Sequence, residues 1–273
     1  MEQYNRIIFV AESGTCRAPM AAGILNEYTL KHPVTIECRG LVVLFPEPLN
    51  QKAEAVMISN GINYDGFTST QLTEEDFTED TLVLTMEHAQ MEKILEKYAN
   101  ARPEQVHVLT ELVGDELEIL DPYGGSLQSY GLCYETMRKT YFSAMFGPQW
   151  EKALSFLEEL SSLSSTDYFN NHGPRYQPDL AKNYGKIREL AGNFQIPEGE
   201  NWEDLRFHCR YTVLLSGALE ALCLGKKEEA DRRFREFCAF IRSRELERER
   251  RLDVFRVIEV AIHYTGFTLP EGE

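Results

Sequence analysis

Short β-rich apolar runs alternate with longer helical stretches through the first half of the chain. Residues 6–11, RIIFVA, form a run that is typical of a central strand of a parallel sheet. Further strands are predicted at residues 34–38, 81–86 and 104–112. Apolar periodicity and flanking Pro, Gly or acidic residues predict helices at 19–31, 50–62, 87–100, 126–146 and 148–163. This alternation predicts an α/β fold with a mostly parallel sheet and right-handed crossovers.

The composition and periodicity of the sequence change after residue 163. Residues 164–178 are rich in Ser, Asn, Gly and Pro and show little periodicity, which indicates a linker or a surface loop. Four helical stretches follow, at 179–193, 202–225, 226–246 and 250–267. A chain of 273 residues accommodates two domains. We therefore expect a first domain at residues 1–163, a linker at 164–178 and an all-helical domain at 179–273.

The helical half offers few chemical signals. Residues 214–241 predict two helices joined at Gly225, with small residues on both sides of the turn. This pattern weakly resembles a tetratricopeptide-type helix pair, but one helix pair with a Gly turn is generic, and an ordinary antiparallel helical hairpin is the favoured interpretation. The dense charges of residues 242–251 are typical of a solvated helix surface.

Charge is distributed unevenly along the chain. The net charge is −16, and residues 1–160 hold 11 Lys and Arg against 25 Asp and Glu, whereas residues 161–273 hold 17 against 19. An acidic field of this size disfavours nucleic acid as a partner and slows the approach of anionic substrates. We expect no nucleic-acid partner.

Cysteine usage and hydropathy indicate the compartment. The six cysteines show no C-x-x-C spacing, so we expect reduced thiols packed as small apolar residues. The first ten residues lack the basic and apolar regions of a signal peptide, and no stretch approaches the roughly 20 apolar residues of a membrane helix. We predict a cytoplasmic protein with no membrane partner.

The stretch FVAESGTCRAPMA, residues 9–21, leads from a strand through a loop into a helix. Loop N–H groups and a helix N-terminus present positive dipole ends, and Arg17 adds a guanidinium fork that suits phosphate oxygens. The residues predict an anion site, although any strand-loop-helix can have this pattern.

A second stretch, ILDPYGGSLQSYG at residues 119–131, places Asp121 before Pro122. We expect this turn at the carboxyl end of the sheet, where open α/β folds place their sites. The alternative is that Asp121 only initiates a turn.

Together these stretches resemble the low-molecular-weight protein tyrosine phosphatases. That family reads Val-Cys-x-Gly-Asn-x-Cys-Arg-Ser-Pro-x-Ala in its phosphate loop, and DPYGGSLQSY resembles its general-acid loop. QLTEEDFTEDTLVLTM, residues 71–86, resembles its middle segment, and the order and spacing match across about residues 5–146. The resemblance implies a three-layer α/β sandwich with a four-stranded parallel sheet. The all-α domain that follows lies outside it.

The resemblance also assigns roles to residues. The position of the nucleophilic cysteine is occupied by Ala11, and that of the serine that supports its thiolate by Ala18. The general-acid position is Asp121, and Tyr123 corresponds to the aromatic pocket wall. The implied phosphate-binding loop consists of Glu12, Ser13, Gly14, Thr15, Cys16 and Arg17. Cys16 is not the nucleophile, because it is adjacent to the arginine rather than six positions before it.

These roles imply a pseudophosphatase. An alanine methyl group forms no phosphocysteine, so the cysteine mechanism of the family is blocked. We expect the loop to bind phosphate, or a phosphorylated small molecule or protein, without a cofactor or metal. The helical domain is then a candidate surface for a protein partner. Two alternatives stay open: a phosphomonoester hydrolase with altered chemistry through Asp121, and a non-catalytic scaffold.

Overall fold

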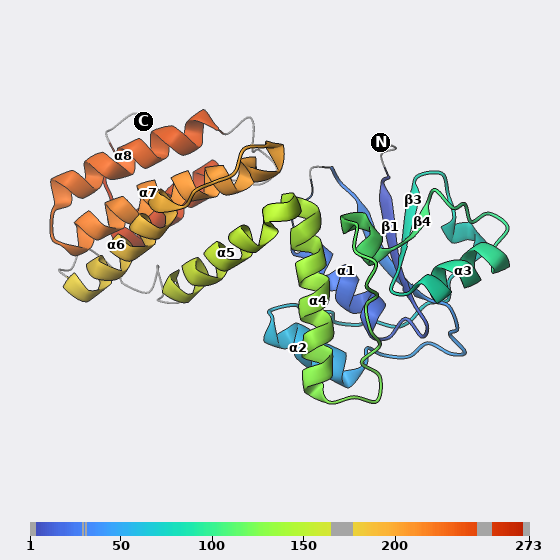
Figure 1. Cartoon of the computed structure of the whole chain (residues 1–273). Coiled ribbons are helices and arrows are strands. Elements are labelled where there is room, and N and C mark those ends of the chain that lie inside the picture. The colour runs from blue at the N-terminus through green and yellow to red at the C-terminus, as the bar shows by residue number, and fades with distance from the viewer. Residues whose placement is uncertain (1–3, 29, 31, 165–176, 245–252, 270–273) are drawn as a thin grey trace. The chain divides into compact units, whose positions relative to one another are not determined.

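The structure is a computed structural model that describes residues 4–28, 30, 32–164, 177–244 and 253–269. The described chain divides into two compact units, residues 1–147 and 148–273 (Figure 1). None of the described helices is long and apolar enough to cross a membrane.

The first unit is built on a four-stranded parallel sheet. Its strands are β1 (Arg6–Ala11), β2 (Thr35–Gly40), β3 (Thr81–Thr85) and β4 (Val106–Val108), in the order β2-β1-β3-β4. All neighbouring pairs are parallel, and Ala11 at the end of β1 is in register with Gly40 at the end of β2. The predicted α/β fold with a parallel sheet is confirmed.

Helices cover both faces of this sheet, which gives three layers (Figure 1). The helices are α1 (Arg17–Asn26), α2 (Gln51–Ser59), α3 (His88–Lys97) and α4 (Leu127–Phe146). Successive side chains of a strand point to opposite faces. Phe9 therefore packs with residues of α1, α2 and α4, whereas Ile8 and Val10 pack with Ile94 of α3. Because both faces of the strand are covered, β1 is apolar from Ile7 to Ala11.

One predicted strand is shorter than the sequence indicated. The expected strand at 104–112 ends at Val108, and residues Leu109–Val113 form the 3-10 helix η2. The side chain of Glu111 accepts a hydrogen bond from the Val108 N–H at 2.9 Å, which closes this turn. The apolar run continues through the turn, so the pattern alone does not mark where the strand ends. Another 3-10 helix, η1 (Glu74–Asp76), precedes β3.

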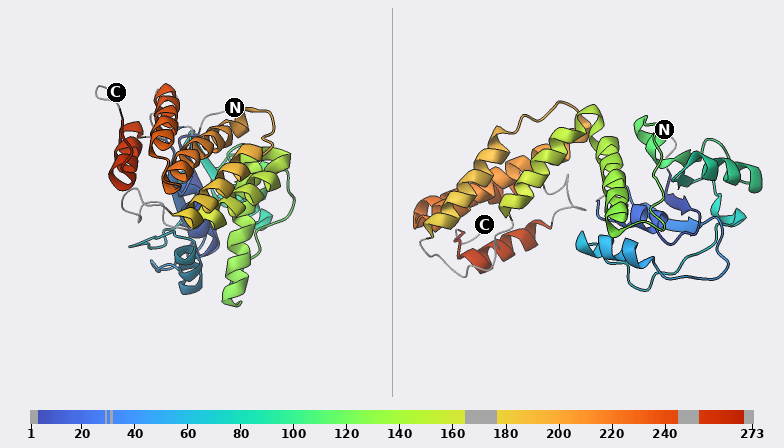
Figure 2. Two further views of the ribbon diagram at one scale, coloured as in Figure 1. Left: turned by 90° about the vertical axis from the view of Figure 1, so that its left-hand side faces the viewer. Right: turned by 60° about the horizontal axis from the view of Figure 1, so that its bottom comes forward.

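The second unit is helical, as predicted (Figure 2). Its helices are α5 (Trp150–Ser164), α6 (Pro178–Asn193), α7 (Glu203–Cys223), α8 (Lys227–Ser243) and α10 (Val254–Thr265), with 3-10 turns η3 (Gly147–Gln149) and η4 (Glu200–Trp202). Helix α6 packs on α5 and α7, and α8 packs on α7 and α10. Gly225, with φ +74°, forms the turn between α7 and α8.

The observed division differs from the predicted domain boundary at residue 163. Helix α5 falls in the second unit, because it packs against α6. Its apolar face is visible in the sequence, but the face does not specify which helix it will contact. Most of the predicted linker, residues 165–176, lies outside the described residues.

Two backbone segments touch at the carboxyl end of the sheet. Gly14 has φ +68°, and a Cβ there would lie 2.7 Å from the backbone N of Gly40. A Cβ on Gly40 would lie 2.7 Å from the carbonyl O of Ser13. The loop after β1 therefore packs backbone to backbone against the end of β2, and both positions require glycine.

We predict that Gly14→Ala lowers the free energy of unfolding by about 1–3 kcal/mol, because it combines a left-handed φ with a backbone clash. Chemical denaturation followed by circular dichroism measures the change. The matched control is Gly131→Ala within α4, where a Cβ meets nothing within 4 Å. That substitution should raise the free energy of unfolding by about 0.5–1 kcal/mol. Equal stability of the Gly14→Ala variant and the unmodified protein would contradict the prediction.

Candidate functional site

The loop at residues 11–16 leaves the carboxyl end of β1, and its carbonyl groups are used structurally. Three of them accept hydrogen bonds from the segment that follows β2. These bonds run from Leu41 N–H to Ala11 O (3.0 Å), from Val42 N–H to Glu12 O (2.9 Å) and from Asn50 N–H to Thr15 O (2.9 Å). The segment at 41–50 therefore fixes the loop through its carbonyl groups.

The N–H groups of the same loop remain available. Within the described chain, no backbone N–H of residues 12–14 or 16–18 donates a hydrogen bond to the protein. The Thr15 N–H makes a long bond of 3.4 Å to Ser13 Oγ, and the two hydroxyl groups of Ser13 and Thr15 lie 2.8 Å apart. Helix α1 begins at Arg17, so its N-terminus adds to these donors. Such a group of free N–H donors is suited to binding an anion.

The Arg17 side chain is buried beside this loop, with 3% of its surface exposed. Its Nη1 donates to Glu87 Oε1 and to the carbonyl O of Ile119 at 2.7 Å, and its Nη2 donates to Asp121 Oδ2 at 2.9 Å. A guanidinium carries five N–H donors, so Nε–H and one Nη2–H keep no protein acceptor among the described residues. Among the described residues, Thr110 Oγ1 is the only side-chain polar atom that is both fully enclosed and without a partner. Arg17 Nε also has no partner in this part of the chain, so it is not fully enclosed. It therefore retains contact with solvent and can donate to a bound oxyanion.

Asp121 makes two interactions at once. Its Oδ1 accepts a hydrogen bond from the Tyr123 N–H at 3.0 Å, which initiates the turn, while its Oδ2 contacts Arg17. The two interpretations of Asp121 from the sequence, turn initiator and site residue, are therefore compatible. Tyr123 lies on the same turn with 80% of its surface exposed. Lys52 Nζ donates to the Gly125 carbonyl at 2.6 Å, which links the start of α2 to this turn.

The structure brings Arg17 and Asp121 of the predicted site into contact, and it adds two partners of Arg17 that the sequence analysis missed. Ala11, Cys16 and Ala18 are buried in one apolar cluster at the end of β1 and the start of α1. Glu12 is exposed and accepts a hydrogen bond from Lys93 Nζ at 3.3 Å.

Glu87, a direct partner of Arg17, follows β3 after one residue. A carboxylate at the carboxyl end of a parallel strand is a signal that could have found it. The role of the Ile119 carbonyl has no side-chain signal.

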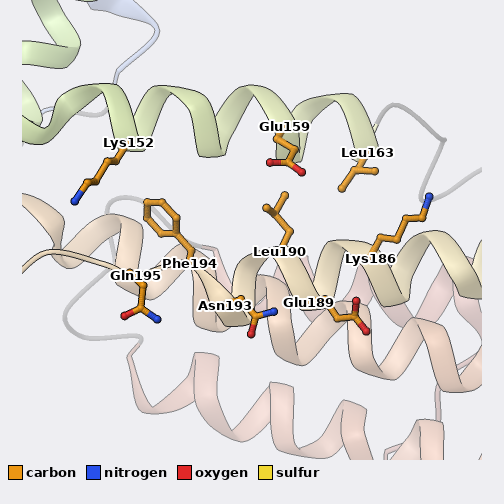
Figure 3. Close-up of a pocket in the computed structure, with 9 residues that line it drawn as sticks. All are labelled: Lys152, Glu159, Leu163, Lys186, Glu189, Leu190, Asn193, Phe194 and Gln195. Atoms are coloured by element: carbon orange, nitrogen blue, oxygen red, sulfur yellow. The ribbon is translucent and has the colours of Figure 1, made fainter.

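The helical unit contains a pocket between α5 and α6 (Figure 3). Its charged lining residues are Lys152, Lys186, Glu159 and Glu189, so the opposite charges are equal in number. Leu190 and Phe194 supply apolar surface. This lining has no electrostatic preference for an anion, in contrast to the loop after β1. In the described part of the chain, no cluster of three His, Cys, Asp or Glu side chains could hold a metal ion.

Cys16, the one thiol in the loop, is protonated at neutral pH. Its pKa is raised to about 12, mainly by burial and to a lesser extent by the Cys133 thiol and Asp121, while Arg17 acts in the opposite direction. Only the thiolate is a strong nucleophile. Cys16 is therefore unsuited to attack phosphorus.

We predict that iodoacetamide modifies Cys16 about a thousandfold more slowly in the native protein than in the unfolded chain at pH 8, because the thiolate fraction falls with the raised pKa. Peptide mass spectrometry measures the rate, with the guanidinium-unfolded protein as the reference and Cys16→Ser as the control for assignment. Native-state labelling as fast as in the unfolded chain would show that Cys16 is a reactive thiolate.

Comparisons with known proteins concern the first unit. Residues 6–146 match the family described as low molecular weight phosphotyrosine protein phosphatase. The chain is 29% identical to the low molecular weight protein-tyrosine-phosphatase PtpB of Staphylococcus haemolyticus over 133 residues, which are 48% of this chain and 91% of that protein. It is 30% identical to the protein-arginine-phosphatase of Geobacillus stearothermophilus over 125 residues, 46% of this chain and 83% of that protein.

Solved structures of similar proteins cover about half of the chain. The low molecular weight protein tyrosine phosphatase from T. tengcongensis is 28% identical, covers 50% of this chain and 93% of its own, and gives a TM-score of 0.47. The YwlE arginine phosphatase from Geobacillus stearothermophilus is 27% identical, covers 56% and 96%, and gives a TM-score of 0.47. The family match spans more than half of the 273 residues. The chain therefore belongs to the low molecular weight phosphotyrosine protein phosphatase family.

Proposed function

We propose that the first unit is a pseudophosphatase that binds phosphate or a phosphorylated ligand in the loop after β1 and does not cleave it through a cysteine. The observation that carries this proposal is the set of free donors: the N–H groups of residues 12–14 and 16–18, with two N–H groups of Arg17. These donors suit the oxygens of a phosphoryl group.

The family mechanism needs an attacking thiolate and an acid that protonates the leaving group. The resemblance puts Ala11 at the position of the attacking atom and Asp121 at that of the acid. Ala11 is buried and supplies only a methyl group, and Cys16 beside it carries a raised pKa. The site therefore keeps groups that bind and an acid, but it lacks the nucleophile.

Phosphate binding must overcome local negative charge. Arg17 pairs with two carboxylates, Glu87 and Asp121, so these three groups together carry about −1 when all are ionised. At an effective dielectric near 20, like charges about 4 Å apart repel by roughly 4 kcal/mol before screening. The loop dipoles and the free guanidinium donors supply the opposing attraction. The absence of a thiolate at position 11 removes a further negative charge and favours retention of the anion.

The related proteins indicate the class of ligand. The two relatives are named as phosphatases of protein tyrosine and protein arginine, so each acts on a phosphorylated protein side chain. We infer that this chain also recognises a phosphoryl group on a larger molecule. The helical unit is the part that would provide a contact to a protein partner.

We predict that the purified protein binds orthovanadate or inorganic phosphate, and that Arg17→Lys weakens this binding by about 10- to 100-fold. Lysine keeps the positive charge but loses the planar fork. Isothermal titration calorimetry measures the affinity, and circular dichroism verifies folding. Arg17→Ala should abolish binding, but it also removes the buried guanidinium that ties Glu87 and the Ile119–Asp121 segment together, so its folding is checked before its affinity is interpreted.

The matched control is Arg39→Lys. Arg39 is also a poorly exposed arginine that pairs with two carboxylates, Glu37 and Asp76, but it lies on β2 outside the loop. That variant should bind vanadate as the unmodified protein does. Tight anion binding that is indifferent to Arg17 would overturn the assignment of the site.

We predict that the unmodified protein shows no measurable turnover of p-nitrophenyl phosphate, and that Ala11→Cys together with Ala18→Ser creates turnover. The pair restores the attacking thiol and the hydroxyl that supports its thiolate. Product release followed by absorbance measures the rate, and Ala18→Ser alone is the control without a nucleophile. A double variant that neither hydrolyses the substrate nor binds vanadate would show that the pocket has lost the family geometry.

The same assay separates the alternatives. Hydrolysis by the unmodified protein that is abolished by Asp121→Asn would indicate a phosphomonoester hydrolase with altered chemistry. Neither hydrolysis nor anion binding would favour a non-catalytic scaffold, in which both units make only protein contacts.

A further inference from the structure

A groove lies between the segment at 115–122 and helix α4 in the first unit. Asp121 lines this groove and also accepts the hydrogen bond from Arg17, so the groove adjoins the anion loop. The other residues of the groove take no part in the phosphate binding proposed above. The groove therefore requires its own explanation.

Three leucines of the groove are exposed to solvent. Leu117, Leu120 and Leu132 have 73%, 80% and 68% of their surfaces exposed. Single exposed leucines are common, but contiguous apolar surface in a hollow is typical of an interaction site. Leu117 and Leu120 belong to the 115–122 segment, and Leu132 belongs to α4, so apolar surface lines both sides of the groove.

The charged residues of the groove are acidic. Asp115, Glu116, Glu118 and Asp121 line it, and its lining contains no lysine or arginine. His88 is the one basic side chain among the lining residues, with its Nδ1 2.8 Å from Glu118 Oε1 and its Nε2 3.2 Å from Glu111 Oε1. Hydrogen bonding to Glu118 raises the pKa of His88, but even a protonated His88 leaves the four lining carboxylates in excess.

We propose that this groove is a docking surface for a segment of a partner protein that combines apolar side chains with lysine or arginine. The leucines would pack against the apolar side chains, and the carboxylates would pair with the cations at the rim. Such complementarity steers association and selects partners. The proposal concerns an unphosphorylated segment, so it stands independently of phosphate binding in the loop.

The charge of the unit argues against the other occupants. Nucleic acids and anionic lipid surfaces carry the same sign as the groove and the surrounding domain, so they are repelled. A second copy of this unit would bring another strongly acidic surface, since residues 1–147 hold 22 Asp and Glu against 10 Lys and Arg. The exposed leucines and the lining carboxylates together favour a protein segment that is both basic and apolar.

The test uses a fluorescein-labelled eight-residue peptide in which leucine alternates with lysine and arginine, titrated with the full chain and followed by fluorescence anisotropy. We expect saturable binding that weakens as salt rises. Leu120→Gln with Leu132→Gln should weaken it about tenfold or more, because two apolar contacts are lost. Asp115→Asn with Glu116→Gln should weaken it about 2- to 10-fold and reduce its salt dependence.

Matched controls lie in the same unit but outside the groove. Ile58→Gln changes a leucine-sized side chain on α2 that is 58% exposed, and Glu75→Gln with Glu79→Gln removes two exposed carboxylates. These controls should bind the peptide as the unmodified chain does, and all groove variants should keep their affinity for vanadate. A peptide with serine in place of every leucine reports attraction by charge alone.

Three results would overturn the proposal. The first is no binding of the leucine-containing peptide up to about 1 mM. The second is equal binding of the serine peptide, which would mean non-specific attraction to an acidic domain. The third is equal loss of affinity in the groove variants and the controls. If the unmodified chain does not bind vanadate, the proposed function is contradicted. Peptide binding in the groove is tested independently of that outcome.

Discussion

The buried guanidinium of Arg17 holds the candidate site together. A cation that is 3% exposed is tolerated only where acceptors surround it, and here they come from Glu87 after β3 and from the Ile119–Asp121 segment before α4. The start of α1 and two segments more than 65 residues away along the chain are thereby fixed to one side chain. Three of the five N–H donors of Arg17 bind these protein acceptors, so the side chain keeps its position without a ligand. The other two donors remain available to a ligand.

The apolar residues at the end of β1 and the start of α1 are consistent with one another. Ala11, Cys16 and Ala18 pack in the same apolar cluster, so the position that the resemblance assigns to the nucleophile belongs to the core of the unit. The resemblance places the supporting serine at residue 18, and a hydroxyl group there would have no thiolate to stabilise if residue 11 holds the position of the nucleophile. The backbone of the loop is specified separately, by the left-handed φ of Gly14 and its contact with the end of β2. The shape of the loop depends on Gly14, whereas its chemistry depends on the side chains at residues 11, 16 and 18.

Much of the first unit could be predicted from the sequence because its signals are local. The β1 run is apolar on both faces, Arg17 lies at a recognisable loop-to-helix junction, and Asp121 lies in a recognisable turn. The end of β4 was missed because a Glu111 side chain, rather than a change in hydropathy, closes the turn at Val108. Glu87 was missed because its importance depends on a partner 70 positions away. The placement of α5 depends on its contact with α6, which an amphipathic pattern does not identify.

The acidity of the first unit and its anion loop place opposite demands on a ligand. A small phosphate ion meets a unit with a large negative charge, and only the loop donors and Arg17 attract it. A phosphorylated protein with basic and apolar residues near the phosphoryl group would satisfy both regions, because its cations would offset the field that its phosphate must enter. The groove and the anion loop are linked through Asp121, which lines the groove and accepts a hydrogen bond from Arg17. A ligand that engaged both regions at once would bind more tightly and more selectively than a ligand that engaged either region alone.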